Sequence, residues 1–223
     1  MANKGNSRHM KRIAAPRYQR IGRKAAKYIV KPRAGRHSLE KSISLVSLLR
    51  DKLGYARNAM EARKILNKGA VEANGKVISD PAYAIGMGDI VKLVPTNESF
   101  AVVIGKHGNI EIEKAKGSSR TLKVTRRYLF KKGKDMIMTH SGENFENKGA
   151  KVNDSVVIEN GKVSKVLPFK VGAECLIESG EHATEKGTIE EIRKGSSRRK
   201  MEVMVKTASG QINTIVDNII VTG

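Results

Sequence analysis

The chain has 223 residues, with 43 Lys and Arg against 22 Asp and Glu, and a formal net charge of +21. This balance favours a polyanionic partner, above all nucleic acid. A single cysteine, Cys175, excludes an internal disulfide framework and a Cys-rich zinc site. With 39% hydrophobic residues and no Trp, the composition suits several small aliphatic cores better than one large core.

Apolar runs are short throughout the sequence. The run from Phe100 to Ile104 is far too short to span a bilayer, and no apolar segment follows the charged N-terminus as it would in a secretory signal. We therefore expect a cytoplasmic protein without a membrane partner.

The positive charge is concentrated at the N-terminus. Residues 1–41 hold 13 Lys and Arg against one acid, Glu40, whereas residues 171–223 hold seven Lys and Arg against eight acids. Residues 1–37 contain too few apolar side chains to offset the entropy cost of ordering them, and their cations repel one another. We predict a basic arm that folds as it binds the phosphates of a nucleic acid. The alternative is a disordered, solvated tail. Its candidate RNA-binding residues are Lys4, Arg8, Lys11, Arg12, Arg17, Arg20, Arg23, Lys24, Lys27, Lys31, Arg33 and Arg36.

Two helices are predicted after the arm. Apolar residues recur at helical spacing over residues 38–53, and Gly54 ends that pattern. A second helix is expected over 59–68, because Asn58 and Glu61 form a capping box in which Asn replaces Ser or Thr.

A hairpin is predicted at Asn74-Gly75, because both central residues of a type I′ turn need positive φ, and a strand is expected over 89–93. The short helix and the hairpin together present a convex basic face suited to a phosphate backbone; an ordinary structural unit with solvated charges is the alternative. The candidate residues on this face are Arg57, Arg63, Lys64, Lys68, Asn74 and Lys76.

The rest of the sequence has the short alternating pattern of an all-β protein. Turn residues at 95–98 and Pro168 predict module boundaries, giving an arm (1–37), a helix-and-hairpin domain (38–95), a central β-barrel or sandwich (96–168) and a small SH3-like barrel (169–223). Strands are expected over 100–104, 110–113, 121–124, 136–138, 156–158 and 162–166, and then over 174–178, 187–192, 202–206, 212–216 and 218–221. The predicted fold class is α+β and mostly β.

Three short motifs in the second module carry a family resemblance. The Glu61-Ala-Arg63 run, the Ala70-Val71 pair and Asn74-Gly75 before a base resemble the S-four RNA-binding domain. Residues 9–16 and 32–39 before this module, and 152–156 and 161–166 after it, follow the order of the archaeal and eukaryotic small-subunit ribosomal protein family S-four-e. The chain end looks more like the archaeal members.

This resemblance covers nearly the whole chain. It implies a structural, non-catalytic protein of the ribosome that binds small-subunit ribosomal RNA and neighbouring ribosomal proteins, supports translation and has a C-terminal KOW-type barrel. The KOW segment departs from the family pattern, because Lys186 fills the usual Arg position and residues 174–191 hold six acids and one base. The acidic stretch could face solvent or a basic neighbour, and the better RNA candidates follow it, namely Arg193, Lys194, Arg198, Arg199 and Lys200.

A second basic patch lies in the central module and surrounds two aromatic residues. Tyr128 and Phe130 could stack on exposed nucleotides, but strand alternation favours them as core residues beneath a basic rim. Shape and phosphate recognition suits so few aromatic residues better than base stacking. The patch consists of Arg126, Arg127, Lys131, Lys132 and Lys134.

No enzyme motif is recognisable. The five histidines are scattered, Cys175 sits at an apolar strand position, and Glu111 and Glu113 fit a solvated strand face better than an acid–base pair. His107 fits a surface turn. We expect no catalytic residue, metal or cofactor. An extraribosomal RNA-binding regulator and, with less support, a KOW-type transcription factor remain the alternative functions.

Overall fold

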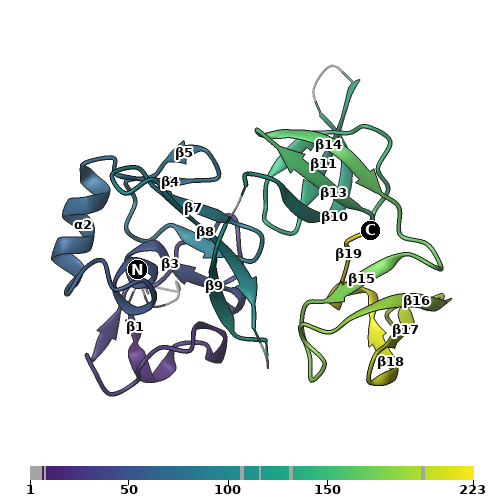
Figure 1. Cartoon of the computed structure of the whole chain (residues 1–223), viewed down its shortest axis with the longest axis horizontal. Helices are drawn as coiled ribbons and strands as arrows, with labels where there is room; N and C mark the ends of the chain where they lie inside the picture. Colours follow the sequence, from purple (N-terminus) through teal and green to yellow (C-terminus); the bar gives the residue numbers. More distant parts are fainter. Residues whose placement is uncertain (1–6, 8, 106–107, 116, 131–132, 197–198) are drawn as a thin grey trace, which may run out of the picture. The chain divides into compact units, whose positions relative to one another are not determined.

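The computed structural model describes residues 7, 9–105, 108–115, 117–130, 133–196 and 199–223. The chain divides into two compact units, unit 1 with residues 1–102 and 112–115, and unit 2 with residues 103–111 and 116–223. Strands dominate both units (Figure 1), so the prediction of a mostly β, α+β fold is confirmed. Within the described ranges, no helix has the length and apolar character needed to cross a membrane.

The main sheet of unit 1 has five antiparallel strands in the order β5-β4-β7-β8-β9. Val71, Val91 and Leu93 point into its core, because alternate residues of a half-buried strand face the same side. β8 and β9, which we placed in the central module, extend this sheet, and the turn at Pro95 connects two paired strands. The strands are β4 (Val71–Ala73), β5 (Lys76–Val77), β7 (Ile90–Leu93), β8 (Glu98–Ile104) and β9 (Ile110–Lys114).

The helix predicted over 38–53 is wrong in its first half. A short 3-10 helix at Leu39–Lys41 is followed by strand β3 (Ser42–Ser44), which pairs with β6 (Ala84–Gly86). The α-helix α1 begins only at Leu45–Ser47 and continues as a π-helix over Leu48–Lys52. The Ser44 hydroxyl accepts a hydrogen bond from the Ser47 backbone N–H at 3.4 Å and so caps the helix. The apolar residues from Ile43 to Leu49 are buried as expected, whereas Leu39 is 38% exposed. Strand pairing with residues 84–86 competes with helix formation over 42–44.

Helix α2 (Ala59–Asn67) and the hairpin follow their sequence signals closely. Asn58 Oδ1 accepts from the Glu61 backbone N–H at 2.9 Å, while Glu61 Oε2 accepts from the Arg57 N–H at 2.8 Å, one residue earlier than in a standard capping box. Asn74 and Gly75 have φ of +54° and +77°, as the type I′ turn requires. Both elements therefore present their side chains as the sequence predicts.

The arm is structured, contrary to the expectation that it lacks a shape of its own. Strands β1 (Met10–Lys11) and β2 (Tyr28–Ile29) pair, and Met10, Ala15 and Ile29 form a small buried cluster. Our expectation considered apolar side chains within residues 1–37 alone. It left out polar contacts with residues 42–89, such as the 2.8 Å hydrogen bond from Gln19 Nε2 to the Ser42 carbonyl.

The central sheet of unit 2 has the order β12-β11-β10-β13-β14. Leu122, Ile137, Val156 and Ile158 are fully or almost fully buried in its core. β10 is long and irregular, because it pairs with β13 over residues 120–123 and continues with β11 alone beyond a bulge at Val124. The strands are β10 (Arg120–Phe130), β11 (Lys134–Thr139), β12 (Asn144–Glu146), β13 (Ser155–Glu159) and β14 (Lys162–Leu167).

The C-terminal sheet of unit 2 has the order β18-β17-β16-β15-β19. Cys175 is fully buried among aliphatic residues, as predicted, and burial raises the pKa of its thiol to about 11. The side chain of Lys123 from β10 is also buried and donates to the Val216 carbonyl at 2.5 Å. The strands are β15 (Glu174–Ile177), β16 (Lys186–Arg193), β17 (Glu202–Thr207), β18 (Gly210–Ile215) and β19 (Ile219–Val221).

Candidate nucleic-acid interface

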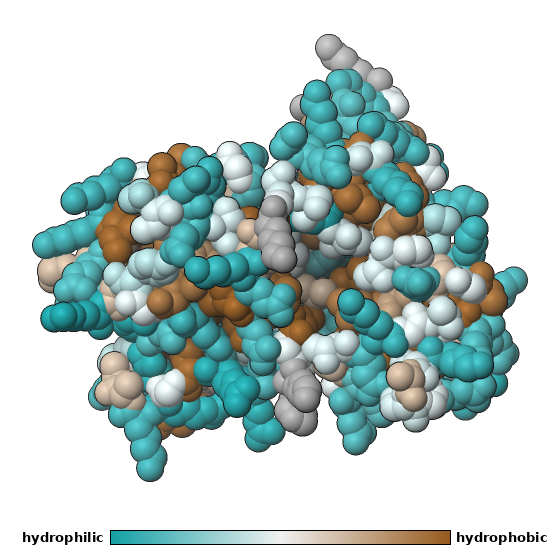
Figure 2. Space-filling view, viewed as in Figure 1, coloured by the Kyte–Doolittle hydropathy of each residue, from teal (hydrophilic) through white to brown (hydrophobic). Residues whose placement is uncertain are grey.

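The surface of the arm carries cations without acidic partners. No carboxylate of the described residues lies within ion-pair distance of these side chains, and most of them are exposed. Hydrophilic residues, in teal, cover much of the visible surface (Figure 2). Such cations keep their full charge available for phosphates. They are Lys11, Arg17, Arg20, Arg23, Lys24, Lys27 and the half-buried Lys31; the predicted residues Lys4 and Arg8 lie outside the described residues.

Arg12 does not belong to this surface, although we predicted that it binds RNA. Its side chain is 3% exposed, and its Nη1 lies 3.4 Å from Asp51 Oδ1 and donates to the Gly22 carbonyl at 3.0 Å. Arg50 Nη2 completes the cluster at 2.7 Å from Asp51 Oδ2. A buried guanidinium paired in this way ties the arm to the π-helix and is inaccessible to phosphate.

Arg36 is used internally as well, at a buried carboxylate. Asp89 is fully buried; its Oδ1 accepts from Arg36 Nη2 at 2.9 Å and Asn74 Nδ2 at 2.8 Å, and its Oδ2 lies 2.9 Å from His37 Nε2 and accepts from the Gly86 N–H at 3.1 Å. Burial alone would raise the pKa of Asp89. The hydrogen bonds from His37 and Asn74, together with the electrostatic attraction of His37 and Arg36, outweigh burial and hold that pKa below its ordinary value.

Asp89 therefore joins three segments that are distant in the sequence. The end of the arm, the hairpin turn and the start of β7 meet at one carboxylate, and Asn74 Oδ1 also accepts from the Ile90 N–H at 2.9 Å. The side-chain amide of Asn74 is thus engaged within the fold, so the predicted RNA contact of this residue is replaced by a structural role. Arg33 is different: its side chain is 74% exposed and pairs loosely with Asp80 at 3.3 Å.

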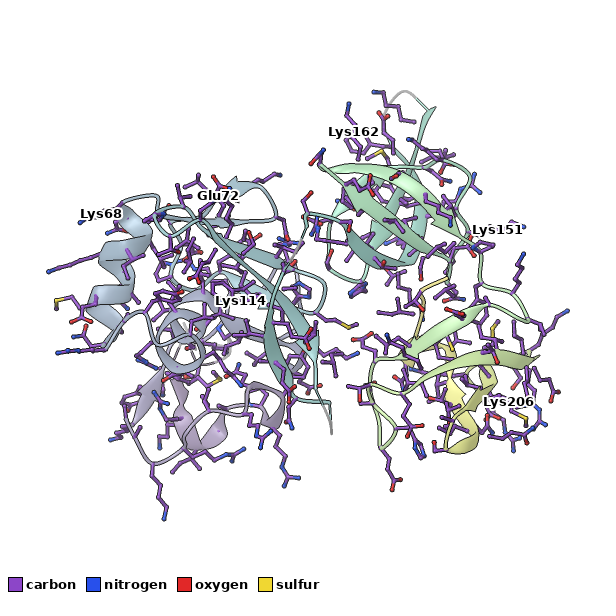
Figure 3. All side chains as sticks on the ribbon, in the orientation of Figure 1. Lys68, Glu72, Lys114, Lys151, Lys162 and Lys206 are labelled. Atoms are coloured by element: carbon purple, nitrogen blue, oxygen red, sulfur yellow. The ribbon has the colours of Figure 1, made fainter. Side chains whose placement is uncertain are left out.

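The cations of α2 and of the hairpin remain exposed, as predicted. Arg63 and Lys64 leave the helix on its solvent side, away from the buried Ala62 and Leu66. Figure 3 shows Lys68 at the end of α2. Arg57 and Lys76 are exposed at the start of the helix and in β5, and no ion pair holds either of them within the described ranges.

The hairpin of β10 and β11 contradicts the expectation that its aromatic residues are core. Phe130 is 54% exposed and Leu129 is 76% exposed, while Tyr128 is half-buried. The reason is the register: beyond residue 124 β10 has lost its partner β13, and at residues 129–130 the hairpin also extends past the residues of β11 that pair with β12. Arg126 is exposed, Arg127 Nη2 pairs with Asp135 Oδ2 at 2.6 Å, and Lys131 and Lys132 lie outside the described residues.

The C-terminal sheet neutralises its own charges. Arg193 pairs with Glu191 at 3.2 Å, Lys200 with Asp217 at 2.7 Å and Lys206 with Glu190 at 3.7 Å. Two of the predicted RNA candidates, Arg193 and Lys200, are therefore paired with acids, Arg193 with one of its own strand and Lys200 with one of the 3-10 helix Val216–Asn218 between β18 and β19. Lys194 and Arg199 are exposed, and Arg198 lies outside the described residues.

The acidic stretch has internal partners too. Glu185 Oε2 accepts from the Ser209 hydroxyl at 2.5 Å, and Glu185 Oε1 lies 3.1 Å from His182 Nδ1. The hydrogen bonds from Ser209 and then His182 hold the pKa of Glu185 below its usual value. Glu190 also accepts from Gln211 at 2.7 Å, so much of the negative charge is used within the sheet.

Three family models match the chain in order: the RS4NT domain at residues 4–40, the S4 domain at 45–91 and the ribosomal family S4e at 96–163. A small ribosomal subunit protein eS4 from Methanocella arvoryzae is 33% identical, covering 96% of this chain and 94% of the relative. The chain belongs to the eS4 family. The eS4 protein of Methanococcus aeolicus is 34% identical, covering 100% of this chain and 97% of the relative.

A solved structure agrees with this eS4 assignment. The crystal structure of the 30S ribosomal protein S4e from Thermoplasma acidophilum matches with a TM-score of 0.68 and 26% identity, covering 82% of this chain and 95% of that chain. The predicted family and its archaeal character are thus confirmed, whereas the KOW identity of residues 169–223 stays a prediction.

Proposed function

We propose that this eS4 protein is a structural component of the small ribosomal subunit in the cytoplasm, where it binds and stabilises small-subunit ribosomal RNA and supports translation. Family membership supports the ribosomal role. The observation that carries the RNA-binding role is the exposed set of arm cations without acidic partners among the described residues. Neighbouring ribosomal proteins are the second class of partner.

The proposed RNA-binding surface combines the arm with α2 and the hairpin. Both belong to unit 1, so one body presents the cations of two sequence segments. Recognition proceeds through phosphates and the shape of folded RNA rather than through many base contacts. The set is Lys11, Arg17, Arg20, Arg23, Lys24, Lys27, Lys31, Arg33, Arg57, Arg63, Lys64, Lys68 and Lys76, with Arg126 and Arg199 as further candidates in unit 2.

We also propose that the chain consists of the four modules predicted from its sequence, and that its role is non-catalytic. The buried Cys175 thiol has a raised pKa of about 11, which makes it a poor nucleophile. Within the described ranges, no group of three or more His, Cys, Asp or Glu side chains is placed to hold a metal ion.

Sedimentation tests the ribosomal role. A ribosomal protein is expected to migrate stoichiometrically with small subunits through a density gradient at moderate salt. A substoichiometric amount would favour the extraribosomal regulator, and migration with RNA polymerase would favour the transcription factor. Either result would overturn the proposal.

Salt titration tests the mode of binding. Six to ten phosphate contacts give slopes of about −4 to −9 when the logarithm of the affinity for small-subunit rRNA is plotted against the logarithm of the salt concentration. A slope near zero would contradict phosphate recognition, because no counterions would then be released on binding.

A further inference from the structure

A cleft of about 800 Å³ opens between the end of the arm and the helices of unit 1. Its walls include Tyr28 and Lys31 from β2 and the segment after it, Arg50 from the π-helix, and Ala59 and Arg63 from α2. In Figure 1 the arm strand β1 lies below α2 in the same unit. The volume is within the range of about 300–1,000 Å³ that small-molecule sites occupy.

The charged side chains that line this cleft are all cationic. Lys31, Arg33, Arg50 and Arg63 contribute to the wall, and no acidic residue does so among the described residues. Arg33 and Arg50 have carboxylate neighbours outside the lining, at 3.3 Å and 2.7 Å. Lys31 Nζ donates to the Ser7 carbonyl at 2.8 Å, and Arg63 has no carboxylate partner within the described ranges. The wall therefore attracts an anion, with Arg63 offering the guanidinium geometry that suits a phosphate.

Tyr28 adds an aromatic surface to this basic wall. Its side chain is 48% exposed, so part of the ring is open to a ligand. The ring of His9 meets the Tyr28 ring edge-on at 5.6 Å and 87°, and Lys27 Nζ lies 5.5 Å from the ring centroid. An exposed ring beside cations is the arrangement by which proteins stack a nucleobase while holding its phosphate.

We propose that this cleft receives a single unpaired nucleotide of an RNA, with the base stacked on Tyr28 and an adjacent phosphate held by Arg63 and Lys31. The proposal rests on the proposed function, since it requires that the protein binds RNA. A free phosphate ion is a poorer fit as the ligand, because it would not contact the apolar part of the wall formed by Tyr28 and Ala59. An acidic peptide would use the cations but not the aromatic face.

Three variants of the full chain, titrated with small-subunit rRNA, test this site. Tyr28→Leu keeps apolar bulk but loses the stacking face, and is expected to weaken affinity about five- to 150-fold, as loss of one stacked base does. Its salt slope should equal that of the wild type, because no phosphate contact is lost. Tyr28→Phe, the matched control, should bind within about twofold of the wild type because it keeps the ring. Arg63→Gln should instead reduce the magnitude of the slope by about 0.7 to 0.9.

Equal binding by wild type and Tyr28→Leu would overturn the proposal while leaving phosphate recognition intact. A flat salt response of the wild type would instead count against the proposed function itself. If Tyr28→Leu fails to fold, ultraviolet cross-linking of the wild-type protein to small-subunit rRNA decides the question. The peptide containing Tyr28 is then expected to carry one nucleotide, and its recovery without any nucleotide, or cross-linked to a neighbouring protein in intact subunits, would overturn the proposal.

Discussion

The arm and the C-terminal sheet of this protein handle their charges in opposite ways. In the sheet and the segments that connect its strands, three bases each pair with a nearby acid, namely Arg193, Lys200 and Lys206. In the arm, Arg12 is buried against Asp51, while cations such as Arg17 and Lys24 have no acidic partner among the described residues. The difference teaches that the number of bases in a segment does not show how many of its charges are free of acidic partners, and the proposed RNA-binding surface depends mainly on those that are.

The two regions also differ in how they are held together. Nine buried hydrophobic residues, including Cys175 and Val205, form the main core of the C-terminal sheet, whereas only three form the buried cluster of the arm described above. The arm compensates with polar links to residues 42–89, above all at Asp51 and Asp89. Stability of the arm should therefore depend on single buried carboxylates, and stability of the sheet on distributed apolar packing.

The largest expected effect is at Asp89. Asp89→Ala leaves the Arg36 guanidinium without this counter-charge and removes the hydrogen-bond partner of His37 Nε2, so unit 1 should lose about 3–5 kcal/mol of unfolding free energy at pH 7. Urea denaturation followed through amide signals of β4 and β7 measures this loss. Asp217→Ala is the matched control, because that carboxylate is 63% exposed and should cost far less. Equal costs at the two positions would contradict the comparison.

The pH dependence of the unfolding free energy gives an independent check on the contribution of Asp89. The pKa of Asp89 is lower in the folded protein than in the unfolded chain, so its contribution is present above the unfolded value of about 3.9 and is lost as pH falls through the folded value. The stability difference between wild type and Asp89→Asn should therefore narrow as pH falls from about 4 through the lowered pKa of folded Asp89, below which both side chains are neutral. A constant difference down to pH 2 would show that ionised Asp89 contributes nothing.

The next effect concerns the apolar core of the C-terminal sheet. At pH 8 a thiol with a pKa of about 11 has a thiolate fraction of about 10⁻³, and the Cys175 side chain is also fully buried. Iodoacetamide should therefore modify Cys175 at least about 100-fold more slowly in the folded protein than in urea. Mass spectrometry over time measures both rates. Similar rates would show that the sheet opens readily and that its core is no firmer than the arm.

Much of this fold could be predicted because its signals are local. The Asn58 cap, the Asn74-Gly75 turn and the strands of both units depend on neighbouring residues. Strand β3 could not be predicted, because apolar residues at helical spacing also satisfy a strand whose partner, β6, lies 40 residues further along.

The candidate site was predictable in composition but not in detail. Basic residues mark the arm, yet which of them are buried depends on Asp51 and Asp89, at separations of 39 and 53 residues from Arg12 and Arg36. Nothing local distinguishes Arg12 from Lys11. Tyr28 is not identified from the sequence for the same reason, because only the fold brings it into one cleft with Arg63, which is 35 residues further along the chain.

A matched pair of triple variants tests the charge comparison directly. The first variant has Gln in place of Lys11, Arg17 and Lys24. It should lower the magnitude of the salt slope for small-subunit rRNA by about 2 to 3, with a clear loss of affinity. The second variant removes the same charge and should leave the slope nearly unchanged, because each replaced base is paired with an acid of residues 190–217. It has Gln in place of Arg193, Lys200 and Lys206. Equal slopes for the two variants would mean that net charge, not its pairing, governs binding.

The smallest effect is expected at the exposed ion pair of Lys200 and Asp217. Both side chains are well exposed, at 70% and 63%, so solvent screens the attraction that joins them at 2.7 Å. A double-mutant cycle with alanine at each position should give a coupling free energy below about 1 kcal/mol, decreasing further in high salt. The role of this pair is then to keep Lys200 close to an acid rather than to stabilise the sheet. A coupling of several kcal/mol would make it a structural link like those of the arm, and the contrast between the two regions would disappear.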